Sequence, residues 1–112
     1  MKYDLLIYQV PGSFEALSPE QQQASQREYM AIGSAPGVVG GEGLQGVDHA
    51  TTVRVRDGRT ITTDGPFAET KEIFGGFYLV EADHLDTAIQ VASRIPAVHQ
   101  GGCVEIRPIL EM

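Results

Sequence analysis

The chain has 112 residues, 42% of them hydrophobic, and its 15 acidic residues against 8 basic ones give a formal net charge of −7. This length suits one domain spanning residues 1–112, the apolar fraction excludes a disordered chain, and the acidic balance disfavours direct binding to nucleic acid. The lone Cys103 cannot form an internal disulfide, and no signal peptide or membrane-spanning apolar run is evident, so we expect a cytoplasmic protein without a membrane partner.

Residues 2–10, KYDLLIYQV, are expected to form the first strand. Leu5, Leu6, Ile7 and Tyr8 are consecutive, so both faces of this strand are apolar, whereas a strand with one face in water would alternate. Each of its two faces must therefore be covered by other protein.

A helix is expected at residues 19–33. Ser18 suits the N-cap, Gln21 completes a capping box, and Gly33 suits the end of the helix. The glycine-rich stretch that follows either holds a short strand at residues 38–44 or is a flexible connector.

Residues 51–65, TTVRVRDGRTITTDG, carry the clearest local pattern in the chain. Valines alternate with Arg54 and Arg56, and Asp57-Gly58 suits a tight type I′ turn between two strands. This pattern predicts a β-hairpin with one apolar face and one basic face.

The last third of the chain predicts a strand, a helix and a final strand. Residues 72–82 are apolar on both faces from Phe77 to Val80 and contain a pair of glycines typical of a β-bulge. The next helix is expected at residues 83–95, with Asp83 as its cap and Pro96 at its end, and residues 102–110 alternate as a strand.

The order of the expected elements is β, α, β, hairpin, β, α, β. This order predicts an α+β fold of the ferredoxin-like, split βαβ type with an inserted β-hairpin. One layer of helices covers one face of the sheet, so we expect a second copy to cover the other face. The homodimer would then enclose a cleft in which a ligand binds.

Five segments resemble the DGPF-type proteins of the YciI-related family. They are GGEGLQ, TTVRVRDG, TDGPFAETKE, GGFYLVEA and VEIRP, in this order along the chain. The resemblance implies a dimeric α+β barrel. Relatives in the YciI branch carry a histidine–aspartate pair in a cleft, with the histidine on the first helix, but residues 19–33 of this chain contain no histidine. DGPF-type members are often encoded beside extracytoplasmic-function sigma factors, which implies a regulatory setting.

The segment TDGPFAETKE holds the candidate catalytic groups. Asp64, in its Gly-Pro turn, is either a turn residue or a carboxylate for acid–base chemistry. Glu69 and Glu72 would share one face of a helical turn, where their like charges push one pKa upward, or would lie on a solvated loop. No histidines show metal-ligand spacing, so neither a metal nor a cofactor is expected.

The candidate ligand-binding residues come from three parts of the chain. Strand arginines are expected to form structural ion pairs or, if they face the cleft, an anion site, with Glu42 and Glu105 as counterions. Phe67 is expected to anchor its loop in the core or the dimer seam, and Cys103 to be a small buried residue. The full candidate set is Arg54, Lys71, Arg107, Gly65, Pro66, Phe67 and Glu42.

Two functions fit this sequence. One is a small-molecule-binding protein, with cofactor-free acid–base catalysis on a small polar or anionic molecule as a further step. The other is a non-catalytic regulatory protein that docks onto a partner through residues 63–72. Exposure of Phe67 on a protruding loop would favour the second function.

Overall fold

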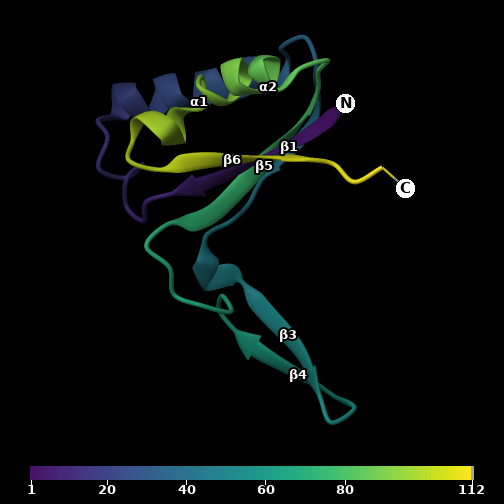
Figure 1. Ribbon diagram of the computed structural model, residues 1–112. Helices are drawn as coiled ribbons and strands as arrows, with labels where there is room; N and C mark the ends of the chain where they lie inside the picture. Colours follow the sequence, from purple (N-terminus) through teal and green to yellow (C-terminus); the bar gives the residue numbers. More distant parts are fainter. Residues whose placement is uncertain (112) are drawn as a thin grey trace.

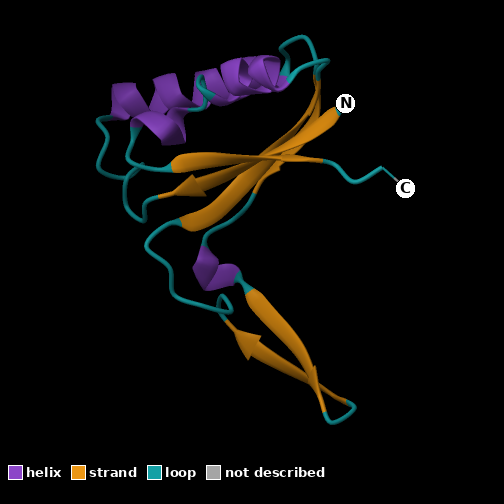
Figure 2. Cartoon of the chain, in the orientation of Figure 1, coloured by secondary structure: helices purple, strands orange, loops and turns teal. Residues whose placement is uncertain are grey.

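The computed structural model describes residues 1–111; Met112, the last residue of the expected domain, lies outside the described residues. The chain forms a sheet covered by helices and a separate hairpin that projects from the sheet (Figure 1, Figure 2). In chain order the elements are β1 (Lys2–Gln9), α1 (Pro19–Gly33), β2 (Val38–Gly43), η1 (Val47–His49), β3 (Thr51–Arg56), β4 (Arg59–Asp64), β5 (Ile73–Glu81), α2 (Leu85–Ala92), η2 (Pro96–His99) and β6 (Cys103–Pro108).

The main sheet has four strands in the order β2-β5-β1-β6, and all three strand pairings are antiparallel. β1 and β2 are thus separated by β5, and β5 and β6 by β1, as in a split βαβ plan. Both helices lie on one face of the sheet (Figure 1). The α+β architecture is compatible with the expected ferredoxin-like fold.

The first helix begins and ends where the sequence predicts. Ser18 Oγ accepts a hydrogen bond from the Gln21 backbone N–H at 3.2 Å, and Gln21 Oε1 accepts one from the Ser18 N–H at 3.0 Å. This reciprocal capping box satisfies two backbone donors that a helix otherwise leaves without partners.

The second helix differs from its prediction at both ends. Asp83 is not the cap: His84 holds the N-cap position in an extended conformation, and its side chain makes no capping bond. The α-helix ends at Ala92, and Pro96 opens the short helix η2 instead of ending α2. The expected span of 83–95 was therefore too long.

The core lies between the helices and one face of the sheet. Tyr3, Leu5 and Ile7 of β1 alternate toward the helices and are buried, and Leu5 is paired with Tyr78 of β5 on one side and Ile106 of β6 on the other. Because residues paired across strands share a face, these side chains form one layer under the helices. Ile32 of α1 and Ile95 pack against this layer on its helix side.

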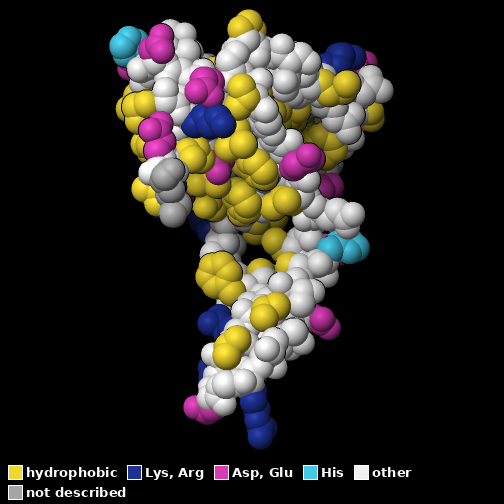
Figure 3. Space-filling model, turned by 90° about the vertical axis from the view of Figure 1, so that its right-hand side faces the viewer, with side chains coloured by type: hydrophobic (Ala, Val, Ile, Leu, Met, Phe, Trp, Pro, Cys, Tyr) yellow, Lys and Arg dark blue, Asp and Glu magenta, His cyan; other side chains and the backbone are white. Residues whose placement is uncertain are grey.

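The opposite side of the sheet, called the open face below, has no helix over it. It carries Leu6 and Tyr8 of β1 with Phe77 and Leu79 of β5, all of them half-buried. On the side of the molecule shown in Figure 3, hydrophobic side chains gather over the middle of the body and acidic ones lie around them. The prediction that β1 and β5 are apolar on both faces is confirmed.

A β-bulge sits in β5 beside β1. Ile7 pairs with Gly76 and Tyr8 with Phe74, so Gly75 has no partner in β1. A Cβ on the next residue, Gly76, would lie 2.7 Å from the Glu42 backbone oxygen, so glycine is needed beside the bulge. The bulge turns Phe74 to the same face as Tyr8.

Residues 51–64 form a two-stranded hairpin, called the arm below. Asp57 and Gly58 at its tip have φ angles of 53° and 74°, as a type I′ turn requires. The arm projects to the side of the sheet opposite the helices (Figure 1). It extends the chain to a radius of gyration of 15.9 Å, against about 13 Å for a compact domain of this length.

Within residues 1–111, the structure contains no helix that is long and apolar enough to span a bilayer.

Candidate functional site

The segment Asp64-Gly65-Pro66 fastens the base of the arm to the loop that follows. Gly65 has a φ of 96°, a conformation that favours glycine. Its N–H donates to the Ala50 carbonyl at 2.7 Å, and its carbonyl accepts from Thr52 Oγ1 at 2.8 Å. The stretch therefore turns the chain and holds residues 66–72 against the start of β3.

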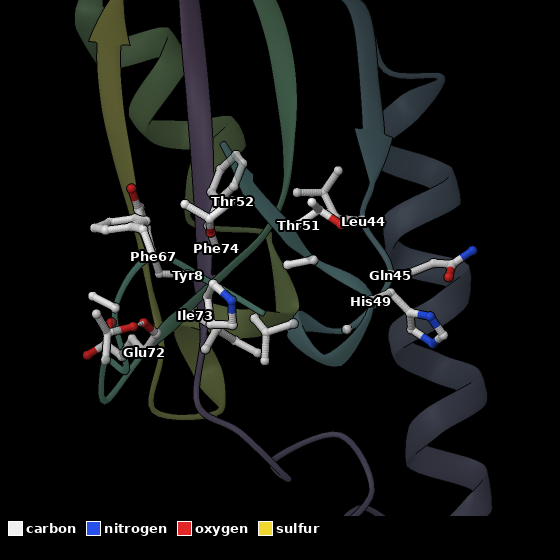
Figure 4. Close-up of a pocket in the computed structure, with 16 residues that line it drawn as sticks. Tyr8, Leu44, Gln45, His49, Thr51, Thr52, Phe67, Glu72, Ile73 and Phe74 are labelled. Atoms are coloured by element: carbon white, nitrogen blue, oxygen red, sulfur yellow. Dashed lines mark hydrogen bonds between the residues drawn. The ribbon is translucent and has the colours of Figure 1, made fainter. Parts of the chain in front are cut away.

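A hollow of about 720 Å³ lies between this loop, the segment 44–52 and the end of the sheet. Its volume is in the range of pockets for small organic ligands. Figure 4 shows the lining side chains around a common space, with Phe67 and Glu72 on one side and Gln45 and His49 on the other. The residues that line it are Tyr8, Leu44, Gln45, Gly46, Val47, His49, Ala50, Thr51, Thr52, Pro66, Phe67, Ala68, Thr70, Glu72, Ile73 and Phe74.

The walls of the hollow are mostly apolar. Tyr8 and Phe74 stack in a tilted arrangement with ring centroids 5.6 Å apart, a favourable geometry for an aromatic pair. Threonine hydroxyls, the Gln45 amide and the His49 ring add polar groups. Glu72 is the carboxylate among the lining residues, so it gives the hollow its fixed negative charge.

Glu72 is held by one hydrogen bond to its side chain and one to its backbone. Its Oε2 accepts a hydrogen bond from the Cys103 thiol at 3.0 Å, and its carbonyl accepts from Thr70 Oγ1. Cys103 is exposed at the start of β6, which corrects the expectation of a buried cysteine. The hydrogen bond to Glu72, with partial burial and the charges of Glu72 and Glu105, raises the pKa of the Cys103 thiol.

The Glu72–Cys103 contact can be tested through thiol reactivity. Replacing Glu72 with Gln removes the negative charge that disfavours the thiolate, so the pKa of Cys103 should fall and its alkylation by iodoacetamide at mildly alkaline pH should become faster. The rate is measured across pH for both proteins. Glu105→Gln, which removes the weaker influence, should give a smaller change. Identical pH profiles for the Glu72 variant and the wild type would contradict the contact.

The structure brings three of the ten expected site residues together at the hollow: Pro66, Phe67 and Glu72. Asp64, Glu69, Lys71 and Arg54 are exposed and do not line it, and Gly65 acts through its backbone. Residues 65–72 contain no helical turn, so Glu69 and Glu72 do not share a helix face. Phe67 is 77% exposed and is not anchored in the core.

Glu42 and Arg107 lie elsewhere on the sheet. Glu42 lines a second cavity of about 590 Å³ between α1 and the β2–β5 edge, in which Tyr78 donates to the Tyr29 carbonyl at 2.7 Å. Burial, with Tyr29 and Glu28 nearby, raises the pKa of Tyr78 to about 12.

Arg107 pairs across the strands with Asp4 on the open face. Burial raises the pKa of Asp4 and Arg107 offsets part of that rise, while Asp4 Oδ1 is buried without a hydrogen-bond partner. Within residues 1–111 the ion pair is Arg94–Glu28, and His49 lies 3.7 Å from Asp48, so within one chain neither Glu42 nor Glu105 pairs with Arg54 or Arg107.

Sequence reasoning did not single out the segment 44–52, which supplies half of the lining. It follows the glycine-rich stretch that fits a flexible connector, and only its position against Phe74 and Pro66 makes it a wall of the hollow. His49 also lines the hollow, and no local signal in the sequence places it there. In the described part of the chain, no three His, Cys, Asp or Glu side chains are grouped to hold a metal ion.

Two comparisons bear on this geometry. The family model described as the YCII-related domain matches residues 1–112. A protein of Rhizobium meliloti (strain 1021), described as uncharacterized, is 35% identical over 117 residues, which cover 97% of this chain and 92% of that protein. Both similarities extend over the sheet, the arm and the loop that bounds the hollow.

Proposed function

This chain belongs to the family of YCII-related domains, and from that premise we propose that it is a homodimeric small-molecule-binding protein whose ligand occupies the hollow. The observation that carries the proposal is the hollow itself, with aromatic walls and a carboxylate at its edge. Ligand sites are commonly concave, apolar and furnished with a few polar groups.

The open face supports the homodimer. Burial of a sheet face that bears Leu6, Phe77 and Leu79 is favourable, because each Å² of apolar surface removed from water contributes about 25 cal/mol to the free energy of association. A two-fold dimer uses the same surface twice, so one apolar face suffices for both subunits. The expected dimeric barrel is the arrangement that such packing produces.

The lining of the hollow favours a largely apolar ligand with one hydrogen-bond donor. Arg54 and Lys71, two basic residues of the expected ligand-binding set, do not line the hollow, and Glu72 would repel a negative group. A hydroxyl, amide or amine group that faces Glu72 would instead donate a hydrogen bond to its carboxylate. This shifts the proposed ligand away from the anionic molecule that the sequence suggests.

Glu72 is also the residue through which catalysis would operate. A carboxylate beside an apolar space can accept a proton from a bound molecule, and the Cys103 thiol, which donates to Oε2, keeps the carboxylate oriented. If the protein is an enzyme, Glu72 is its general base, and Asp64 and Glu69 are not part of the chemistry.

A variant that fills the hollow tests the proposal. Ala68→Trp places a large ring in the space next to Phe67 and should remove binding of an uncharged, apolar fluorescent probe such as Nile red, together with any thermal stabilisation by compounds from a metabolite library. Probe fluorescence and melting temperature are measured for the wild type and the variant.

The matched control is Ala24→Trp, on the exposed surface of α1 away from the hollow. It should bind the probe and the library compounds like the wild type. Compounds that stabilise Ala68→Trp as much as the wild type would place the binding site elsewhere. A library in which no compound stabilises the wild type would count against small-molecule binding.

The regulatory function is a second candidate, supported by the exposure of Phe67. Aromatic residues, phenylalanine included, are enriched in protein–protein interfaces. Affinity capture with the wild type and Phe67→Ser distinguishes the two functions. A partner that is lost with Phe67→Ser, together with no compound that stabilises the wild type, would favour the regulatory function.

A further inference from the structure

The arm has almost no contact with the rest of its own chain beyond its base. Every residue of β3 and β4 is exposed except Thr52, and Val53 and Val55 have 60% and 70% of their surface in water. An isolated two-stranded hairpin is marginally stable in water. The arm therefore needs a surface to pack against.

The arm has two chemically different faces, which follow from its register and the alternation of side chains along a strand. On one face Val53 pairs with Thr62 and Val55 with Thr60, so this face is apolar and β-branched. Arg54 and Arg56 lie on the other face opposite Ile61 and Arg59. Three of the chain's 8 basic residues are thus gathered on one face of the arm.

The open face of the sheet carries more acidic than basic residues: Asp4, Glu42, Glu81 and Glu105 against Lys2 and Arg107. Glu42 on β2 and Glu105 on β6 are exposed on this face, at its two edges, as their pairings with Phe77 and Leu6 show. All the acidic residues of the chain except Asp57 and Asp64 lie outside the arm. A second copy of this chain therefore offers carboxylates with which the arm's arginines can pair.

The position of the arm suits the same partner. The arm lies on the side of the sheet opposite the helices, where a second sheet would pack (Figure 1). Its strands of 6 residues are about 20 Å long, whereas packed sheets lie about 10 Å apart, so the arm extends beyond the layer of the partner's sheet and flanks its edge.

We propose that the arm, residues 51–64, clasps a second copy of this chain, with its arginine face on the carboxylates at the edge of the partner's open face. The clasp rests on the homodimer of the proposed function and adds a consequence for the hollow. Thr51, Thr52 and Phe67 line the hollow at the base of the arm, so the subunit held by the arm closes it. The binding site is then complete only in the clasped dimer.

Complementary charge reversal tests the clasp. One protein carries Arg54→Glu, Arg56→Glu and Arg59→Glu, and another carries Glu42→Lys and Glu105→Lys. Each alone places like charges together, so its dimer should dissociate at least about tenfold more readily than the wild type at low salt, with a smaller difference at high salt. An equimolar mixture restores opposite charges at both contacts and should form a heterodimer with near wild-type affinity, measured by sedimentation equilibrium.

Each outcome is informative. A wild type that stays monomeric overturns both the homodimer and the clasp. A wild-type dimer that is unaffected by the arm reversals, or a mixture that does not recover, overturns the clasp alone. Arg27→Glu, an exposed reversal on α1, is the matched control and should leave the dissociation constant within about twofold of the wild type.

A second measurement avoids any dependence on how the reversed variants fold. Arg56→Cys in a Cys103→Ser background carries a benzophenone near the tip of the arm, and the labelled protein is mixed with isotope-enriched chains before illumination. Crosslinks between the two isotopic forms, mapped to β2 or β6, are expected. Crosslinks confined to one isotopic form would overturn the clasp.

Discussion

Leu6→Asp is expected to separate the dimer into folded monomers. Leu6 lies in the middle of the open face, between Phe77 of β5 and Glu105 of β6, and it is not part of the core under the helices. Burying an unpaired carboxylate in an interface costs several kcal/mol, which corresponds to a dissociation constant about a thousandfold higher. Sedimentation equilibrium gives the constant, and circular dichroism shows that the helices persist.

The control for this change is Leu85→Asp. Leu85 is also a leucine and is more exposed than Leu6, but it opens α2 on the helix side, where an acidic residue is tolerated near a helix N-terminus. This variant should dimerise like the wild type. If Leu6→Asp dimerises just as tightly, the open face is not the interface.

Leu5→Ala is expected to destabilise the protein by about 2–5 kcal/mol, the usual cost of a cavity in a core. Leu5 is 0% exposed and sits between Tyr78 and Ile106 under the helices, so the space it leaves is enclosed on every side. Urea unfolding at a fixed protein concentration measures the change, because dissociation and unfolding are linked in a dimer.

Leu5 and Leu6 make an internal comparison, because they are neighbours that point to opposite faces. Leu110→Ala, at a leucine that is 78% exposed, is the control for side-chain loss and should cost less than about 0.5 kcal/mol. An equally small effect of Leu5→Ala would mean that the helix-side core is placed wrongly.

The local parts of the fold could be predicted from the sequence because their signals are local. The capping box of Ser18 and Gln21 fixes the start of α1, and Asp57-Gly58 has the residues that a type I′ turn needs. The paired glycines at residues 75 and 76 likewise predicted the bulge found at Gly75. The start of α2 was missed by one residue, because the path of the chain from β5 makes His84, and not Asp83, the last extended residue.

The site was harder to predict because it depends on contacts between distant segments. The density of charge at residues 63–72 indicated Asp64, but the structure brings only Glu72 of the three carboxylates to the hollow. Glu72 gains its position from Cys103, 31 residues further along the chain. The segment 44–52 has no chemical signal of its own, and it becomes a wall only because Leu44 and Ala50 are bonded to Gly75 and Gly65.

The most direct test of this account is the mass of the wild-type protein in solution at low micromolar concentration, measured by sedimentation equilibrium. We predict a species of twice the mass of one chain, with the amides of the arm protected from hydrogen exchange at the same concentration. A single subunit whose arm exchanges freely would contradict the account, because the open face and the arm would then be stable in water without a partner.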